Sequence, residues 1–420
     1  MFTNTKVSMQ NKLKIINDPV HGFIRIPHEI LFDVIEHPYF QRLRRIGQTG
    51  LLNLIFPGAT HTRFHHALGA MHLMFTALET LRQKGVKITE EEEKGAMLAI
   101  LMHDIGHGPF SHALENMLMD DWHHEKLSLL LMNKLNEEFG GQLSVAIEMF
   151  QGKYHRKFFN QLISSQLDVD RLDYLNRDSF FTGVSEGVIS FDRIIKMLDV
   201  SGDQLVVEEK GIYSIEKFLI ARRLMYWQVY LHKTVIAAEQ MLVKILERAK
   251  ELASVGIKLF ATPCLSHFLN YSVTAEDFIT DPVHLEMFSK LDDHDIFTSI
   301  KVWADHEDLI LSTLCKHLIA RNLYQVEISN EPPRLEKIDL LVEEGLSCFD
   351  INEDDASYFV FTDTIKNNAY SVGDGNINLL MKDGSVLDIT LASDNSNLEA
   401  LAKTVKKYIL CYLKELKQPD

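Results

Sequence analysis

The sequence has 420 residues, of which 46% are hydrophobic and 24% charged, which is enough chain for two or three domains at ~150 residues each. Its 43 basic and 59 acidic residues give a formal net charge of −16, which argues against a nonspecific binder of nucleic acid or anionic membrane, because such proteins carry a surplus of Lys and Arg. Four widely spaced cysteines argue against a disulfide framework and a zinc ribbon, and no apolar run forms a signal peptide or reaches the ~18 residues of a membrane span, so we expect buried free thiols and a cytoplasmic protein.

Most of the chain is predicted to be helical. Apolar side chains recur at helical spacing from residue 30 to 135, with Gly and Pro confined to the joints. The same spacing continues through 143–177, 190–200 and 214–252, and the last of these stretches contains neither Pro nor Gly. We therefore expect a mainly α protein with a helical domain over residues 1–320.

The composition changes near the string NEPPRLEK. Residues 322–328 and 358–361 are predicted as strands, and 376–391 as a hairpin that turns at Asp383-Gly384. A closing helix is predicted over 396–416. These elements predict a small α+β subdomain over residues 321–420.

Nine of the 19 histidines lie between His61 and His124, a density that metal or proton-transfer chemistry requires and a packed core does not. In MLAILMHDIGHGPFSHALE, an apolar helix leads to His103 and Asp104 and breaks at the glycines that follow. Adjacent helical residues point ~100° apart, so both side chains reach one ion only where the helix ends beside a cavity. The pattern H-D-x-G-H-x-P-x-x-H therefore favours a metal site over a chance His-Asp pair.

Further ligands should come from other helices, because one His and one Asp hold a divalent ion poorly. The string THTRFHHALGAMH offers His66, and QLDVDRLDYLNRD offers Asp168, Asp170 and Asp173. Two imidazoles and two carboxylates suit Mn, Fe, Ni, Mg or Zn, with positions open for water and a substrate oxygen. Phosphate chemistry also needs cations that are not the metal, and the bases near these strings and on the later long helix are Arg63, Arg171, Arg177, Arg222 and Lys233.

Several strings resemble the HD-domain phosphohydrolases, and among them the deoxynucleoside triphosphate triphosphohydrolases that join a SAM domain to an HD domain. In the family's order, the strings are KIINDPVHGFI, HPYFQRLRRIGQ, FPGATHTRFHHALG, HDIGHGPFSH, WHHEK and DVDRLDYLNRD. They cover residues 12–180 well and 181–320 more loosely. The resemblance implies an HD-domain helical bundle, a divalent metal ion and a nucleotide substrate.

The resemblance also implies roles for single residues. The metal ligands fall on His66, His103, Asp104 and Asp170. The residues around the scissile phosphate fall on His107, His112, His124 and Glu115, the last of which orients one of the histidines. The sugar and triphosphate contacts fall on Gln48, Arg63, Arg171, Tyr174, Asp178, Arg222 and Tyr230.

Allosteric members of the family add a second nucleotide site. It lies at a subunit contact, so we expect a homo-oligomer, a dimer or tetramer, with an activating guanine nucleotide. The residues that match this site are Lys14, Asn17, Glu36, Gln41 and Arg44. The alternative is that Arg44 and Glu36 only cap and pair on a surface helix.

Three departures from the family concern the substrate and leave the metal ligands intact. No stretch resembles a SAM domain, Thr49-Gly50-Leu51-Leu52 stands where the family has glycines after Gln48, and Tyr226 stands where it has a histidine. The leading prediction is attack of water on the α-phosphorus, with His112 or His124 handling the proton, to give a deoxynucleoside and tripolyphosphate. A hydrolase of a nucleoside monophosphate, cyclic nucleotide or ppGpp and a non-enzymatic nucleotide sensor stay open as alternatives, although the complete ligand set argues against the sensor.

Overall fold

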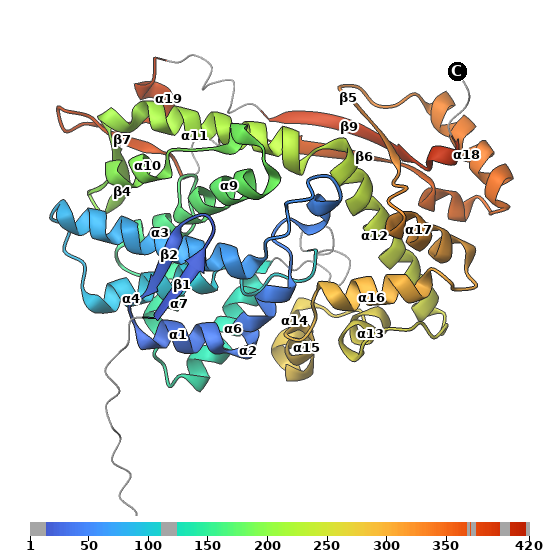
Figure 1. Cartoon of the computed structure of the whole chain (residues 1–420), viewed down its shortest axis with the longest axis horizontal. Coiled ribbons are helices and arrows are strands. Elements are labelled where there is room, and N and C mark those ends of the chain that lie inside the picture. Colours follow the sequence, from blue (N-terminus) through green and yellow to red (C-terminus); the bar gives the residue numbers. More distant parts are fainter. Residues whose placement is uncertain (1–13, 111–123, 368–369, 371–374, 395–403, 417–420) are drawn as a thin grey trace, which may run out of the picture.

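The computed structural model describes residues 14–110, 124–367, 370, 375–394 and 404–416 (Figure 1). Helices make up most of these residues, and short strands form three small sheets. The prediction of a mainly α protein is therefore confirmed. Across these ranges, no helix combines the length and the apolar character that crossing a bilayer requires.

The first described residues form a β hairpin, which short helices follow. Strand β1 (Lys14–Asp18) pairs antiparallel with β2 (Gly22–Ile26). Helix α1 (Glu29–Glu36) buries apolar residues at positions i, i+1, i+4 and i+5 of one face, as an amphipathic helix on a core does. The elements after it are α2 (Pro38–Gln41), η1 (Arg42–Arg45) and η2 (Gly50–Leu54).

A bundle of helices follows and carries most of the candidate site. Its members are α3 (Arg63–Gln83), α4 (Glu90–Met102), α6 (His124–Glu138), α7 (Ser144–Phe150), α8 (Lys157–Ile163) and α9 (Val169–Thr182). Helix α3 packs between α4 and α9. The acidic run at residues 90–93 begins α4, where Thr89 and Glu92 cap each other's backbone N–H groups at 3.1 and 2.8 Å.

The stretch 214–252 is two helices and not one. Helix α11 (Ile212–Met225) passes into a π-helical turn, η5 (Tyr226–Tyr230), in which Leu231 N donates to Tyr226 O at 2.7 Å. Helix α12 (Lys233–Ser254) then begins at the cap formed by His232. A π turn needs no Pro or Gly, so the sequence carries no sign of this break.

Smaller elements connect and extend these helices. Between α9 and α11 lie η3 (Ser185–Gly187), α10 (Phe191–Met197), β3 (Leu198–Ser201), β4 (Gln204–Glu208) and η4 (Glu209–Gly211). After α12 come α13 (Pro263–Asn270), α14 (Ala275–Thr280), α15 (Pro282–Phe288), α16 (Asp293–Trp303) and α17 (Leu309–Ile319).

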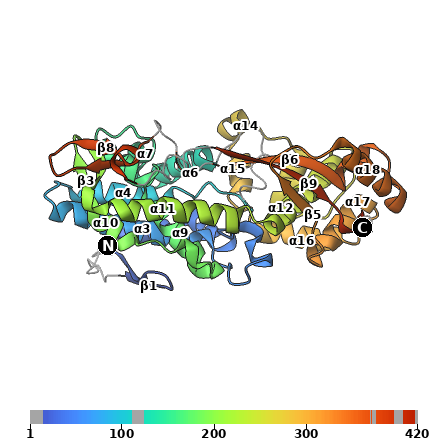
Figure 2. The ribbon, with the colours of Figure 1, turned by 90° about the horizontal axis from the view of Figure 1, so that it is seen from above.

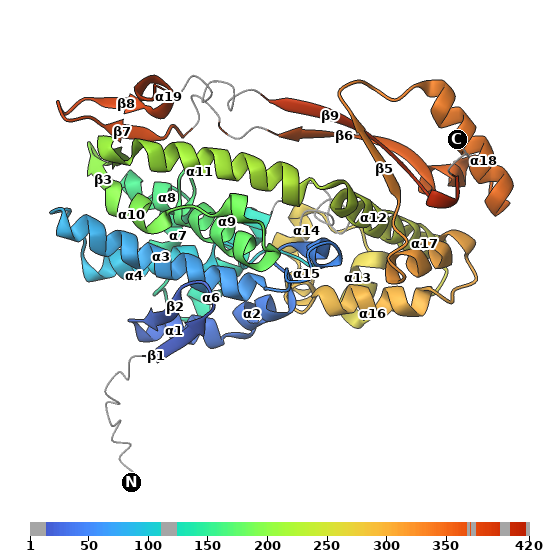
Figure 3. The ribbon, with the colours of Figure 1, turned by 45° about the horizontal axis from the view of Figure 1, so that its top comes forward.

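The C-terminal residues form strands that lie along the helices (Figure 2). The elements are β5 (Gln325–Ser329), α18 (Leu335–Phe349), η6 (Asp354–Tyr358), β6 (Val360–Asn367), β7 (Asn378–Leu380), β8 (Val386–Asp388), α19 (Ile389–Ala392), β9 (Val405–Tyr412) and η7 (Lys414–Leu416). The hairpin predicted at 376–391 is confirmed, because β7 and β8 pair across Asp383-Gly384. Strand β7 also pairs with β4, which extends a sheet that begins among the helices, while β5, β9 and β6 lie beside α12 (Figure 3). The boundary at 320 stays a prediction.

The closing helix predicted over 396–416 is wrong. Residues 405–412 form β9, the central strand of the sheet β5-β9-β6. Ile409, Leu410, Cys411 and Tyr412 are buried in succession, as in a strand covered on both faces, so no alternation distinguishes the run from a helix. Of the four free cysteines, Cys348 is exposed, and the other three are buried as expected.

Candidate active site

The HD segment leaves α4 at His103 and turns sharply. Asp104 follows His103, the C-cap of α4, and Gly106 then lies against α6. A Cβ atom on Gly106 would stand 2.2 Å from Ser128 N and 2.4 Å from the His124 carbonyl oxygen. Ser128 Oγ accepts from Gly106 N at 2.9 Å and donates to the His103 carbonyl at 2.6 Å. Glycine is therefore required for the turn that brings His103 and Asp104 to one cavity.

A buried arginine fixes this turn from the other side. Arg42 donates to the carbonyl oxygens of Ile105 and His107, each at 2.9 Å, and to that of Leu291 at 3.0 Å. Burial lowers its pKa to about 10. Nothing in the string RLRR distinguishes this arginine from its exposed neighbours, and sequence reasoning missed it.

The four predicted metal ligands lie together. Helix α3 supplies His66, the end of α4 supplies His103 and Asp104, and α9 supplies Asp170. His66 Nε2 is 3.0 Å from Asp170 Oδ1 and 3.8 Å from Asp104 Oδ2. His103 Nε2 is 3.2 Å from Asp104 Oδ1 and 3.5 Å from Asp170 Oδ1. The donor atoms of His66, His103 and Asp170 all lie within 4.8 Å of one another, and Asp104 faces one imidazole with each of its two oxygens.

The two imidazoles are oriented as metal ligands usually are. His66 Nδ1 donates to Asp173 Oδ2 at 2.8 Å, and His103 Nδ1 donates to the Ile100 carbonyl at 2.6 Å. These bonds place the ring protons on Nδ1 and direct both Nε2 lone pairs at the centre, where neither atom makes a hydrogen bond to a described residue. Buried acceptors of this kind need a cation or a proton.

The charges of the centre also suit a cation. Burial raises the pKa of Asp104, but the neighbouring histidines, His103 first, outweigh it and hold that pKa well below its usual range. Burial is likewise outweighed at Asp170 by His103 and His66. Burial lowers the pKa of His66, yet Asp170 and Asp173 raise it to about 10, so a proton and a metal ion compete for Nε2. Two carboxylates and two imidazoles fit a divalent ion.

A second cluster adjoins the first through Asp104. His107 Nε2 lies 3.3 Å from Asp104 Oδ1, and the rings of His107 and His124 stack with their centroids 3.8 Å apart. Burial, together with Arg63, holds the pKa of His107 well below its usual range, so this imidazole is neutral. His112 and Glu115, the other two residues predicted near the phosphate, lie outside the described residues.

Asp173 supports the centre from behind. Besides His66, its carboxylate accepts from His21 Nε2 at 2.6 Å and from Arg177 Nε and Nη2 at 2.8 and 3.0 Å. Arg177 also donates to Asp18 at 2.8 and 3.2 Å. All of these groups are buried. Sequence reasoning offered Asp173 only as an alternative metal ligand and gave His21 no role, although KIINDPVHGFI contains both Asp18 and His21.

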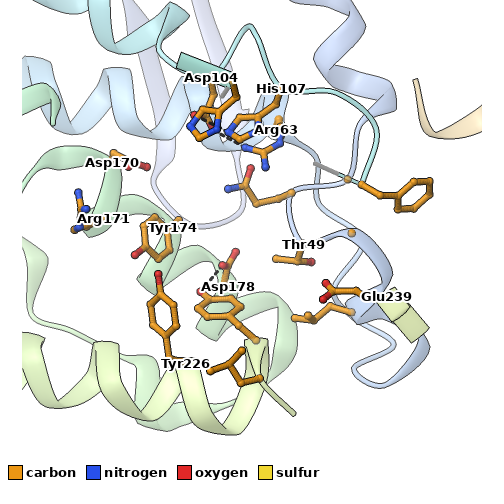
Figure 4. Close-up of a pocket in the computed structure, with 18 residues that line it drawn as sticks. Thr49, Arg63, Asp104, His107, Asp170, Arg171, Tyr174, Asp178, Tyr226 and Glu239 are labelled. Carbon is orange, nitrogen blue, oxygen red and sulfur yellow. Dashed lines mark hydrogen bonds and ion pairs between the residues drawn. The ribbon is translucent and has the colours of Figure 1, made fainter. Parts of the chain in front are cut away.

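A pocket of about 500 Å³ opens from the metal centre (Figure 4). At one side lie Asp104, His107, Asp170 and the guanidinium groups of Arg63 and Arg171. The predicted sugar and phosphate residues that line the pocket are Gln48, Arg63, Arg171, Tyr174, Asp178 and Tyr230. The remaining wall consists of Gly47, Thr49, Gly50, Leu52, Phe110, His124, Tyr226, Leu231 and Glu239.

The comparisons with known proteins agree with this geometry. The family model described as HD domain matches residues 63–178, and the model described as HD associated region matches residues 189–261. The uncharacterized protein YwfO of Bacillus subtilis is 34% identical over 86% of this chain and 81% of its own length. The chain belongs to the HD-domain phosphohydrolase family. A crystal structure of a phosphohydrolase from Bacteroides thetaiotaomicron is 52% identical, with a TM-score of 0.92 over 96% of this chain and 100% of that chain.

More distant members of the HD-domain family carry a substrate in their names. The deoxynucleoside triphosphate triphosphohydrolase SAMHD1 homolog of Dictyostelium discoideum is 32% identical over 61% of this chain and 53% of its own length. This chain therefore spans about half of that relative.

Asp168 serves the HD site without touching the metal ligands. It is the N-cap of α9, where Oδ1 accepts from Arg171 N and Oδ2 from Ser165 N, each at 2.8 Å. The same carboxylate pairs with the Arg171 guanidinium. Asp168 thus holds Arg171 at the pocket wall.

Asp178 is held between two side chains. His61 Nε2 lies 2.7 Å from Asp178 Oδ1, and the Tyr230 hydroxyl donates to Asp178 Oδ2 at 2.6 Å. His61 stacks on Phe181 at 4.4 Å. Sequence reasoning counted His61 among the nine histidines but gave it no role.

Three predicted cations lie outside the pocket wall. The Arg222 guanidinium is 6.0 Å from the Tyr226 ring, and its Nε and Nη1 make no hydrogen bond within the described parts of the chain. Arg177 is occupied by its two buried carboxylates, and Lys233 is exposed at the start of α12. Of the candidate phosphate cations, Arg63 and Arg171 face the pocket.

The residues predicted for an activating nucleotide lie outside the pocket wall, and all but Gln41 are exposed. Lys14 and Asn17 belong to β1, Glu36 ends α1, and Gln41 ends α2. Arg44 Nε donates to Gln41 Oε1 at 2.8 Å. This contact also fits the alternative that Arg44 only pairs with neighbours on the surface. The activating nucleotide site therefore stays a prediction.

Proposed function

We propose that this HD-domain phosphohydrolase hydrolyses deoxynucleoside triphosphates to a deoxynucleoside and tripolyphosphate. The observation that carries the proposal is the order of groups along one pocket. One histidine, two aspartates and two arginines at one side would take the metal ion and the phosphates, and Tyr174, Asp178 and Tyr230 would take a sugar. The names of the SAMHD1-type relatives support this substrate class.

Four residues would hold the metal ion: His66, His103, Asp104 and Asp170. A divalent ion bound there supplies Lewis acidity and lowers the pKa of water. The chain's own cations do the rest of the phosphate binding, because Arg63 and Arg171 line the pocket beside these ligands and guanidinium groups match phosphate oxygens.

Proton transfer falls to the histidine cluster. Since His107 is neutral and buried, it can hydrogen-bond a phosphate oxygen without adding a charge. His124 stacks on His107 and lines the pocket, which suits it to give a proton to the nucleoside oxygen that leaves. His112 remains the other candidate for this role.

A product assay tests the proposal. Purified protein is incubated with Mn²⁺ and a panel of dNTPs, NTPs and monophosphates, and nucleoside, phosphate and tripolyphosphate are measured separately. Tripolyphosphate with deoxynucleoside supports the proposal. Inorganic phosphate alone from a monophosphate identifies the alternative hydrolase, and binding without any product identifies a sensor.

Selection against ribonucleotides tests the sugar site. Gln48, Tyr174 and Asp178 line the pocket, and the rings of Tyr174 and Tyr230 lie edge to face with their centroids 6.4 Å apart, so a 2′-hydroxyl would have to fit among these side chains. We expect a higher kcat/KM for dGTP than for GTP. Equal values would show that the pocket does not distinguish the two sugars.

We also propose an activating guanine nucleotide at a contact between subunits of a homo-oligomer. Lys14, Asn17, Glu36 and Arg44 are exposed, and Glu36 would accept from guanine N–H groups while Lys14 and Arg44 face its phosphates. Linkage requires that an activator shifts assembly and rate together. Sedimentation and dATP hydrolysis with and without GTP, in wild type and Arg44→Ala, test this. An unchanged mass and rate in wild type would remove the site.

A further inference from the structure

The side of the pocket away from the phosphate cations has a different chemistry. Phe110 and Glu239 both lie beside Gly50 there, and Leu52, Leu231 and Thr49 also line the pocket. Figure 4 shows Glu239 and Thr49 across the pocket from Asp170 and Arg171. A substrate whose phosphates lie at the metal centre would place its nucleobase here.

Glu239 is the carboxyl group at this end of the pocket. No residue in the described ranges hydrogen-bonds to it, and burial alone raises its pKa to about 7. A Cβ atom at Gly50 would lie 4.0 Å from Glu239 Oε1 and 4.0 Å from Phe110 Cδ1. The carboxyl and the aromatic ring therefore both lie beside Gly50, whose missing side chain leaves space next to each of them.

The two loops at this end are held by one side chain. Asp293, at the start of α16, accepts from Gly47 N at 2.8 Å and from Phe110 N at 3.3 Å. Phe110 has a φ of +47°, a conformation that costs a non-glycine residue energy and persists only where its surroundings enforce it. The aromatic wall is thus fixed before a ligand binds.

We propose that Glu239 recognises the nucleobase and selects guanine. The inference rests on the proposed function, because it places a nucleotide in this pocket. Guanine presents N1–H and the 2-amino group side by side, and the two oxygens of a carboxylate accept from both. Adenine and cytosine present one donor beside one acceptor, and thymine presents one donor between two acceptors, so each leaves a carboxylate oxygen unpaired. A desolvated carboxylate left in this state is costly, and a pocket built on such a group rejects the wrong base.

The test compares substrates and one substitution at pH 8, where the carboxylate form prevails. Values of kcat/KM are measured with Mn²⁺ for dGTP, dITP, dATP, dCTP and dTTP, with a constant concentration of GTP so that any activation is equal. We expect dGTP to exceed dATP by about tenfold or more, and dITP, which lacks the 2-amino group, to lie between them. Glu239→Gln offers one acceptor and one donor, which pair with adenine and equally with the O6 and N1–H of guanine, so the preference for dGTP over dATP should be lost.

Glu247→Gln is the matched control. Glu247 lies on the same helix, outside the pocket wall, and pairs with Lys244 at 2.8 Å. It should keep the wild-type order of substrates. A wild type that hydrolyses dGTP and dATP equally, or a Glu239→Gln protein that keeps the preference for dGTP, would overturn the proposal while leaving the triphosphohydrolase function standing.

A binding experiment tests base recognition by Glu239 independently of the proposed dNTP hydrolysis. Calorimetry with dGTP and dATP is carried out in EDTA, where turnover stops, on proteins that carry Arg44→Ala, so that the proposed activating site does not contribute. Tighter binding of dGTP that Glu239→Gln abolishes would support the role of Glu239 even if the product assay excluded dNTP hydrolysis. Equal binding of both nucleotides would overturn it.

Discussion

Asp173→Asn tests whether the carboxylate that accepts a hydrogen bond from His66 Nδ1 sets the affinity of the site for its metal ion. The side chain keeps its shape but loses the charge that holds the His66 Nδ1 proton at 2.8 Å. Loss of such a partner lowers metal affinity by ~10–100-fold, which corresponds to about 1.4–2.7 kcal/mol. Removing one partner from a buried ion pair also destabilises a protein by roughly 3–5 kcal/mol, and here Arg177 keeps Asp18, so the loss should lie below that range.

Asp18→Asn is the control that separates these effects. It deprives the same buried Arg177 of a carboxylate at 2.8 and 3.2 Å and leaves the His66 bond intact. Its Oδ1 still accepts from the Val20 and His21 amides. Mn²⁺ titration by calorimetry and urea unfolding followed by circular dichroism should show a stability loss in both variants but a metal loss in Asp173→Asn alone. Equal metal loss in both, or wild-type affinity in Asp173→Asn, would refute the reasoning.

Further predictions concern the metal centre, Glu239 and the N-cap of α9. Asp104→Ala should lose hydrolysis and bound metal together while keeping the helical circular dichroism spectrum, and turnover by a metal-free Asp104→Ala protein would contradict the assignment. Burial raises the pKa of Glu239 from 4.5 to about 7, so the folded protein binds this proton more tightly than the unfolded chain does and loses stability as pH rises through this range. Glu239→Gln lacks this proton equilibrium. Between pH 5 and pH 8, its free energy of urea unfolding should therefore rise by about 1–3 kcal/mol relative to that of the wild type. Asp168→Asn should raise KM for the triphosphate through Arg171 and leave Mn²⁺ affinity unchanged, and a loss of metal content would instead make Asp168 part of the centre.

Local sequence patterns predicted the features that depend on near neighbours. The helical body follows from apolar spacing, and the turn after His103 follows from the glycines beside it. The meeting of His66, His103, Asp104 and Asp170 is a property of three helices, and here the resemblance to the HD family selected Asp170 from three aspartates.

Features that depend on distant partners escaped prediction. Strand β9 contains Lys406 and Lys407 followed by a continuous apolar run, and only its position between β5 and β6 makes it a strand. Glu239 has the sequence surroundings of any glutamate on an amphipathic helix, because the loops that bury it come from residues 47–52 and 110. Asp173 differed from Asp168 in no local respect, although one contacts a metal ligand and the other caps a helix.

The π-helical turn between α11 and α12 gives the pocket a means of evolutionary change. Such a turn holds one residue more than an α-helical turn, and each residue of a helix is rotated ~100° from the last. Deleting one residue from 226–230 would make this turn an ordinary α-helical end of α11 and rotate Tyr226 relative to Tyr230, while α12, which begins anew after the extended His232, could keep its packing. A single insertion or deletion can thus exchange the side chains that face the ligand without rebuilding the core, and variation in length at this turn should accompany changes of substrate among relatives.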